Sequence, residues 1–191
     1  MTNNIFLKFP HLSWRGMVHV LSLAKDVEKV KKLRRGRCRE LFIGIESGSE
    51  SVRRKINKLG TIDDIITVSK AILESGIDLK GYFYLWISRR NKRRFSKKHM
   101  NWLLKIKEIS TNTTGTFRTS VFQFRPYHGT QLYNEIVKST GIIHECEFNQ
   151  SISKFEGRSQ FNFDFGNYSK EKDEILSQYI IKTQELTKEE K

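Results

Sequence analysis

The chain alternates short, almost uninterrupted apolar runs with segments of helical periodicity. The runs are ELFIGI at 40–45, LKGYFYLWI at 79–87 and TSVFQF at 119–124. Apolar side chains at successive positions predict strands that are covered on both faces, as in a parallel sheet. The segments that follow them read as amphipathic helices: 50–57, 62–75, 99–109 and 131–140. Strands and helices alternating at this spacing predict an α/β fold with a parallel sheet.

Local signals extend this pattern toward both ends of the chain. Residues 26–35 predict a helix that ends at Gly36, and residues 5–7 and 14–20 each have the composition of a short strand. Thr61 and Asp64 have the spacing of a capping box for the helix that begins at Ile62. Ser49 and Thr130 are expected to cap the helices that follow them. An irregular, aromatic-rich stretch at 142–168 and a helix at 169–186 complete the expected organisation.

Several classes of protein are disfavoured by composition. No apolar run approaches the roughly 20 residues of a membrane-spanning helix, and the first residues do not resemble a secretory signal. The two cysteines, Cys38 and Cys146, cannot form a disulfide framework, so we expect reduced thiols in a cytoplasmic protein. Together with five scattered histidines, they form no group with metal-ligand spacing.

The positive charge is concentrated in two segments. The chain has a formal net charge of +14, and the segments 25–39 and 89–108 account for all of it. Focused positive charge favours a phosphate-bearing partner such as nucleic acid, although solvated helix faces would have the same composition. The arginines of the second segment are the candidate anion-binding residues: Arg89, Arg90, Arg93 and Arg94.

Polar residues follow the predicted strands at the point where each strand ends. Right-handed crossovers bring the carboxyl ends of parallel strands to one edge of the sheet, where ligands bind in such folds. The candidate binding residues are therefore those that close the strands, namely Glu46, Ser47 and Ser49, the segment after Trp86, and the segment 125–130. Gly44, within the first of these strands, would let a helix or a ligand approach closely.

Three motifs in this order resemble the later half of the radical S-adenosylmethionine core. They are GIESGSESVRRKINK at 44–58, GIDLKGYFYLWI at 76–87 and FQFRPYHGTQLYNEI at 122–136. The resemblance covers about residues 10–140 and is closest to members of the superfamily that carry a cobalamin-binding domain. It implies a partial (β/α) barrel of parallel strands over residues 1–141, with 142–191 as an extension ending in a helix.

The resemblance also implies cofactors and site residues. The superfamily uses S-adenosylmethionine and a [4Fe–4S] cluster to start radical chemistry, and cobalamin is a further possible cofactor. Glu46, Ser47 and Ser49 match the segment that reaches the ribose or amino group of S-adenosylmethionine, while Phe124, Arg125 and Tyr127 would lie beside the adenine. Alternatively, Glu46 and Ser49 only cap a tight turn, and the residues at 124–127 only pack at a strand end.

The sequence departs from the family pattern at two places. The three-cysteine motif that holds the cluster, CxxxCxxC, is absent, and neither Cys38 nor Cys146 can replace it. Residues 86–91, WISRRN, replace the expected Gly- and Pro-containing turn. We therefore expect that this chain alone is not catalytically competent. It would be a fragment, a split subunit that acts with a partner chain carrying the cluster-binding half, or an inactive copy. The alternatives are a basic nucleic-acid-binding module and a non-catalytic structural remnant.

Overall fold

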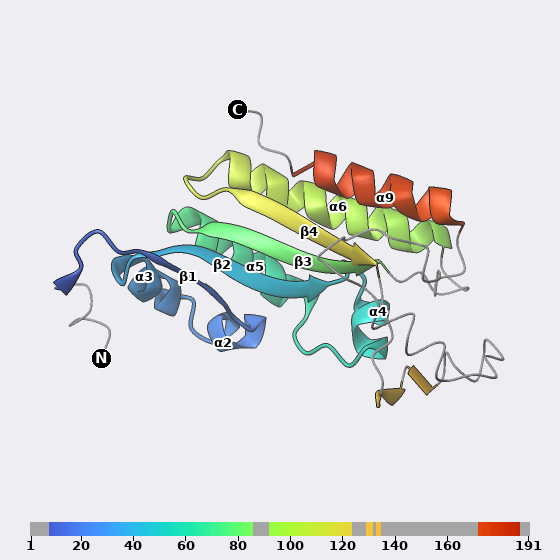
Figure 1. The fold of residues 1–191 in the computed structure, drawn as a ribbon, viewed down its shortest axis with the longest axis horizontal. Helices are drawn as coiled ribbons and strands as arrows, with labels where there is room; N and C mark the ends of the chain where they lie inside the picture. Colours follow the sequence, from blue (N-terminus) through green and yellow to red (C-terminus); the bar gives the residue numbers. More distant parts are fainter. Residues whose placement is uncertain (1–7, 86–91, 124–128, 132, 135–171, 188–191) are drawn as a thin grey trace.

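The predicted strands assemble into one parallel sheet. The computed structural model describes residues 8–85, 92–123, 129–131, 133–134 and 172–187. Within these residues the strands are β1 (Trp14–Met17), β2 (Cys38–Glu46), β3 (Asp78–Leu85) and β4 (Phe117–Gln123). They pair in parallel in the order β1-β2-β3-β4, so each crossover moves one strand further in the same direction (Figure 1). The expected α/β fold with a parallel sheet is confirmed at this level.

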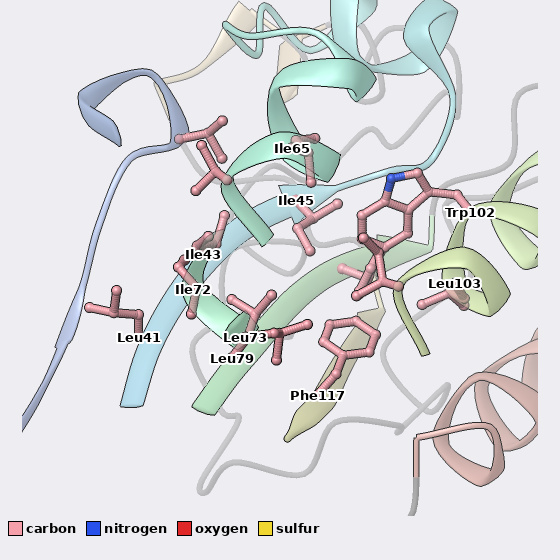
Figure 2. Packing of buried hydrophobic residues seen from close by; sticks show 14 of the residues in the cluster. Leu41, Ile43, Ile45, Ile65, Ile72, Leu73, Leu79, Trp102, Leu103 and Phe117 are labelled. Atoms are coloured by element: carbon pink, nitrogen blue, oxygen red, sulfur yellow. The ribbon is translucent and has the colours of Figure 1, made fainter. Parts of the chain in front are cut away.

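The helices cover one face of this sheet. They are α2 (Val20–Ala24), α3 (Glu28–Arg35), α5 (Ile62–Glu74), α6 (Lys92–Thr111) and α9 (Asp173–Glu185), whereas α4 (Glu50–Lys55) lies at the carboxyl end of β2 (Figure 1). Alternate residues of the strands pack into the layer between sheet and helices. In Figure 2, Ile43 of β2 and Leu79 of β3 lie among residues of α5, and Trp102 of α6 lies near Phe117 of β4. Each fully buried Leu or Ile side chain contributes about 1.5–3 kcal/mol, and this layer forms the core.

The start of α5 follows the predicted capping box. The Thr61 hydroxyl accepts from the Asp64 backbone N–H at 3.0 Å, and the Asp64 carboxylate accepts from the Thr61 N–H at 2.8 Å. The hydrogen bonds that the Asp64 carboxylate accepts from the Thr61 N–H and from the Thr61 hydroxyl lower the pKa of Asp64. The predicted apolar face is buried at Ile65 and Ile72. Gly76, with φ of 70°, then reverses the chain into β3.

Two elements differ from the sequence prediction. Helix α6 begins at Lys92, whereas the sequence predicted a start near His99. The prediction missed the first turns because they are polar and basic and show no apolar periodicity. The segment 14–20 divides into β1 and the start of α2, whose five residues are too few to show helical periodicity. The expected strand at 5–7 and the extension at 142–168 lie outside the described residues.

The terminal helix α9 packs against the same core as the rest of the sheet. Leu176 and Ile180 belong to the buried apolar cluster, and the Thr119 hydroxyl of β4 lies 2.7 Å from the Thr187 hydroxyl. None of the described helices has the length and apolar character needed to cross a bilayer.

Candidate functional site

Glu46 ends β2 in an unusual backbone conformation. Its φ of 63° lies in the left-handed region, which costs a non-glycine residue roughly 1–2 kcal/mol. The Ser47 N–H donates to the Ile45 carbonyl at 2.8 Å, and the β2–β3 register shifts between Gly44 and Glu46. The chain therefore turns sharply at this point, which carries the Glu46 carboxylate back over Gly44.

Gly44 is needed for this arrangement. A methyl group at Gly44 would lie 2.6 Å from Glu46 Oε1 and 2.9 Å from Lys58 Nζ. The group that approaches Gly44 closely is thus the side-chain pair of Glu46 and Lys58. Any larger residue at this position would displace the pair.

The two oxygens of the Glu46 carboxylate have different surroundings. Lys58 Nζ donates to Oε1 at 2.7 Å, and the two side chains are 26% and 13% exposed, Lys58 being the more exposed. The other oxygen, Oε2, is buried and has no hydrogen-bond partner in the described part of the chain. Buried polar oxygens almost always have a partner, and leaving one without costs about 1–3 kcal/mol. Oε2 is therefore an unsatisfied acceptor that protein atoms cover in this conformation.

The two predicted serines are used mainly within the turn. Ser47 is fully buried, and its hydroxyl accepts from the Ser49 backbone N–H at 3.1 Å. Ser49 occupies the N-cap position of α4, as expected, but its side chain makes no capping hydrogen bond and instead lies 3.0 Å from the Ser51 hydroxyl. Their hydroxyls thus stabilise the turn that carries Glu46.

The buried side chain of Arg53, in α4, donates hydrogen bonds to three backbone carbonyls around the Glu46 turn. Its guanidinium donates to the Ile45 carbonyl, and to the carbonyls of Leu59 and Gly60 at 3.0 Å each. The residue is 1% exposed, and burial lowers the pKa of its guanidinium, while the nearby Glu50 and Glu46 carboxylates act in the opposite direction. Arg53 therefore fixes the end of β2 against the loop that leads to α5.

The sequence pattern did not single out Arg53 or Lys58 as site residues. Lys58 stands at the end of the motif at 44–58, and the motif is the one signal that could have indicated it. Arg53 follows the apolar residue Val52 in the predicted helix 50–57, and only this position hints at its burial.

The second part of the predicted site, the segment 124–130, is described only at 129–130. Phe124, Arg125 and Tyr127 lie outside the described residues, although β4 ends at Gln123 on the same sheet edge as Glu46. The Thr130 hydroxyl accepts from the Tyr133 N–H at 3.2 Å, consistent with its expected capping role. Of the candidate anion-binding arginines, Arg93 and Arg94 lie near the start of α6, and Arg89 and Arg90 are outside the described part.

The described residues do not fit an iron–sulfur cluster. No group of three His, Cys, Asp or Glu side chains with the proximity of metal ligands occurs among them. Cys38 is fully buried in β2, and burial raises the pKa of its thiol to about 11. A cluster needs several thiolates, and this thiol is a core residue.

Comparison with known proteins adds no relative: no family model matches the chain, and no curated protein matches it. The site is therefore characterised by its own geometry. It contains a carboxylate with one oxygen bonded to a lysine and the other buried without a hydrogen-bond partner in the described part of the chain.

Proposed function

We propose that this chain is the S-adenosylmethionine-binding part of a radical S-adenosylmethionine-type barrel. The nucleoside would bind at the carboxyl edge of the sheet. The observation that carries the proposal is the buried, unpartnered Oε2 of Glu46 at the end of a parallel strand. The uninterrupted strand order β1-β2-β3-β4 supports it, because consecutive strands of a (β/α) barrel are neighbours in the same way.

Each residue of the motif has a role in this proposal. Glu46 Oε2 accepts a hydrogen bond from a ribose hydroxyl or from the amino group of the ligand. Lys58 holds Oε1 and so orients the carboxylate, and Gly44 leaves the space for both side chains. By the resemblance, Phe124 and Tyr127 would lie beside the adenine.

The proposal assigns the cluster to other residues. Because the described residues do not fit a [4Fe–4S] cluster, its ligands would come from a partner chain with the other half of the barrel. In the superfamily, S-adenosylmethionine supplies the adenosyl group for radical chemistry. The function proposed for this chain is to bind and orient it.

Isothermal titration calorimetry with S-adenosylmethionine and S-adenosylhomocysteine tests the proposal. The wild-type chain is expected to bind both, and Glu46→Gln is expected to weaken binding about 10- to 150-fold. This range corresponds to the roughly 1.5–3 kcal/mol of a hydrogen bond to a charged group. Asp63→Asn is the matched control, because Asp63 is an exposed carboxylate in the first turn of α5, away from Glu46.

Two outcomes would overturn the proposal. One is a wild-type chain that is folded by circular dichroism and binds neither ligand at millimolar concentration. The other is an affinity that Glu46→Gln leaves equal to that of the Asp63→Asn control.

A further inference from the structure

The sheet face opposite the helices carries a row of aromatic side chains. The row consists of Phe42, Tyr82 and Phe122, one from each of β2, β3 and β4, with ring centroids 6.0 and 5.7 Å apart. These residues alternate along the strands with core residues such as Ile43 and Val121, so they point away from the core. The described helices α2, α3, α5, α6 and α9 lie on the other side of the sheet (Figure 1).

Basic side chains accompany this aromatic row. Lys80 Nζ lies 5.8 Å from the centre of the Tyr82 ring, and Lys80 pairs in register with Phe42 on one side and Arg118 on the other. Strand pairing places Phe42, Lys80 and Arg118 side by side on the same face. The aromatic row therefore has cations along its amino-terminal side.

A single carboxylate holds two arginines at this position. Glu40, which is 7% exposed, contacts Arg118 through Oε1 and Arg15 through Oε2, the latter at 3.9 Å. The side chains of Arg15 and Arg118 are 74% and 46% exposed, so both retain donors that face solvent. Asp78 pairs in register with Glu40 and adds a second carboxylate to this face. Together with Lys80, the three cations exceed the two carboxylates by one, so this part of the face has a small positive surplus.

We propose that this face binds single-stranded nucleic acid. Bases would stack on Phe42 and Tyr82, and backbone phosphates would contact Lys80, Arg118 and Arg15. Rings displayed on a sheet can reach bases only when these are unstacked, which favours a single strand over a duplex. The net charge of +14 favours a polyanion as a partner of the chain as a whole, although it comes from the segments 25–39 and 89–108 and not from this face. The inference uses none of the side chains of the Glu46 site, but Tyr82 pairs in register with Gly44, so the aromatic row and that site lie on the same face of the sheet. In the barrel proposed above this face would point inward, so nucleic acid would compete for it with the partner half of the barrel.

Fluorescence anisotropy with a labelled 12-nucleotide RNA of mixed sequence tests the assignment. Phe42→Leu and Tyr82→Leu keep apolar volume but remove the aromatic ring, and each is expected to weaken binding about 5- to 150-fold. Phe9→Leu is the matched control, because Phe9 is an exposed aromatic that precedes β1, and it should leave affinity unchanged.

A salt titration separates the charged contacts from the stacking. Lys80→Gln is expected to reduce the slope of log affinity against log salt by about 0.7, the value for one phosphate contact on a single strand. Lys70→Gln, on the exposed side of α5, is the matched control and should leave the slope unchanged.

Amide chemical-shift mapping on the wild-type chain makes the test independent of variant folding. Addition of the RNA should shift the resonances of Phe42, Lys80, Tyr82 and Arg118. Shifts confined to the basic helix α3, unchanged affinity in both leucine variants, or no binding at low salt would each overturn the proposal. Equally tight binding of inorganic polyphosphate, which has no bases, would overturn it as well.

Discussion

Removing the buried guanidinium of Arg53 should be one of the most costly single changes in the described part of the chain. Arg53→Met keeps much of the apolar side chain but removes the donors to three backbone carbonyls, those of Ile45, Leu59 and Gly60. A hydrogen bond from a charged donor contributes about 1.5–3 kcal/mol. The Ile45 carbonyl keeps the Ser47 N–H as a partner, so its loss is the smallest of the three.

One effect opposes this loss. The wild-type guanidinium is desolvated, and its Nε has no hydrogen-bond partner in the described residues, so the methionine variant is relieved of that cost. The net destabilisation is then about 3 kcal/mol, which corresponds to a decrease in Tm of about 6–12 °C for a chain of this size. This is a large part of the roughly 5–15 kcal/mol by which domains are stable.

Urea unfolding followed by circular dichroism measures this free energy. Arg54→Met is the matched control, since Arg54 is the exposed neighbour on the same short helix and should change the free energy of unfolding by less than about 0.5 kcal/mol. Arg53→Lys keeps the charge but cannot present a planar fork to three carbonyls, and it should remain clearly destabilised. A loss below about 1 kcal/mol in Arg53→Met would refute the role assigned to this side chain.

Two further predictions concern the core. Gly115→Ala should destabilise the fold by about 1–3 kcal/mol, because its methyl group would lie 2.5 Å from the Ile77 carbonyl oxygen, whereas Gly36→Ala should be nearly neutral in the same urea experiment. The pKa of the Cys38 thiol is raised from 9.0 to about 11, so the folded state keeps this proton to a higher pH than the unfolded chain. The stability that Cys38 contributes should be complete below about pH 9 and decrease between pH 9 and 11, and an unchanged free-energy difference between wild type and Cys38→Ala over that range would contradict this.

The main strands of the sheet could be predicted because their signal is local. Continuous apolar composition identified the segments that became β2, β3 and β4, and their parallel pairing followed from the helices between them. The order of the strands in the sheet did not follow from this pattern. The beginning of α6 could not be predicted, because its stability comes from the core contacts of later residues such as Trp102 and Leu103 rather than from its basic first turns.

The candidate site was predictable only in part. Glu46 was found because it closes a strand. Gly44 was found because a glycine within a buried strand indicates that another group approaches the backbone closely. The Glu46–Lys58 pair joins residues twelve positions apart across a turn and a short helix, and no local periodicity encodes that contact. The motif at 44–58 contains both residues, but their pairing depends on the left-handed turn at Glu46.

Amide chemical-shift mapping with S-adenosylhomocysteine tests the central claim most directly. This ligand has the nucleoside and amino acid groups of S-adenosylmethionine without its reactive sulfonium. The account predicts saturable shifts at Gly44, Glu46 and Ser49, together with Lys58, and their loss in Glu46→Gln. Shifts elsewhere that leave these resonances unmoved, or no shifts at millimolar ligand, would contradict it.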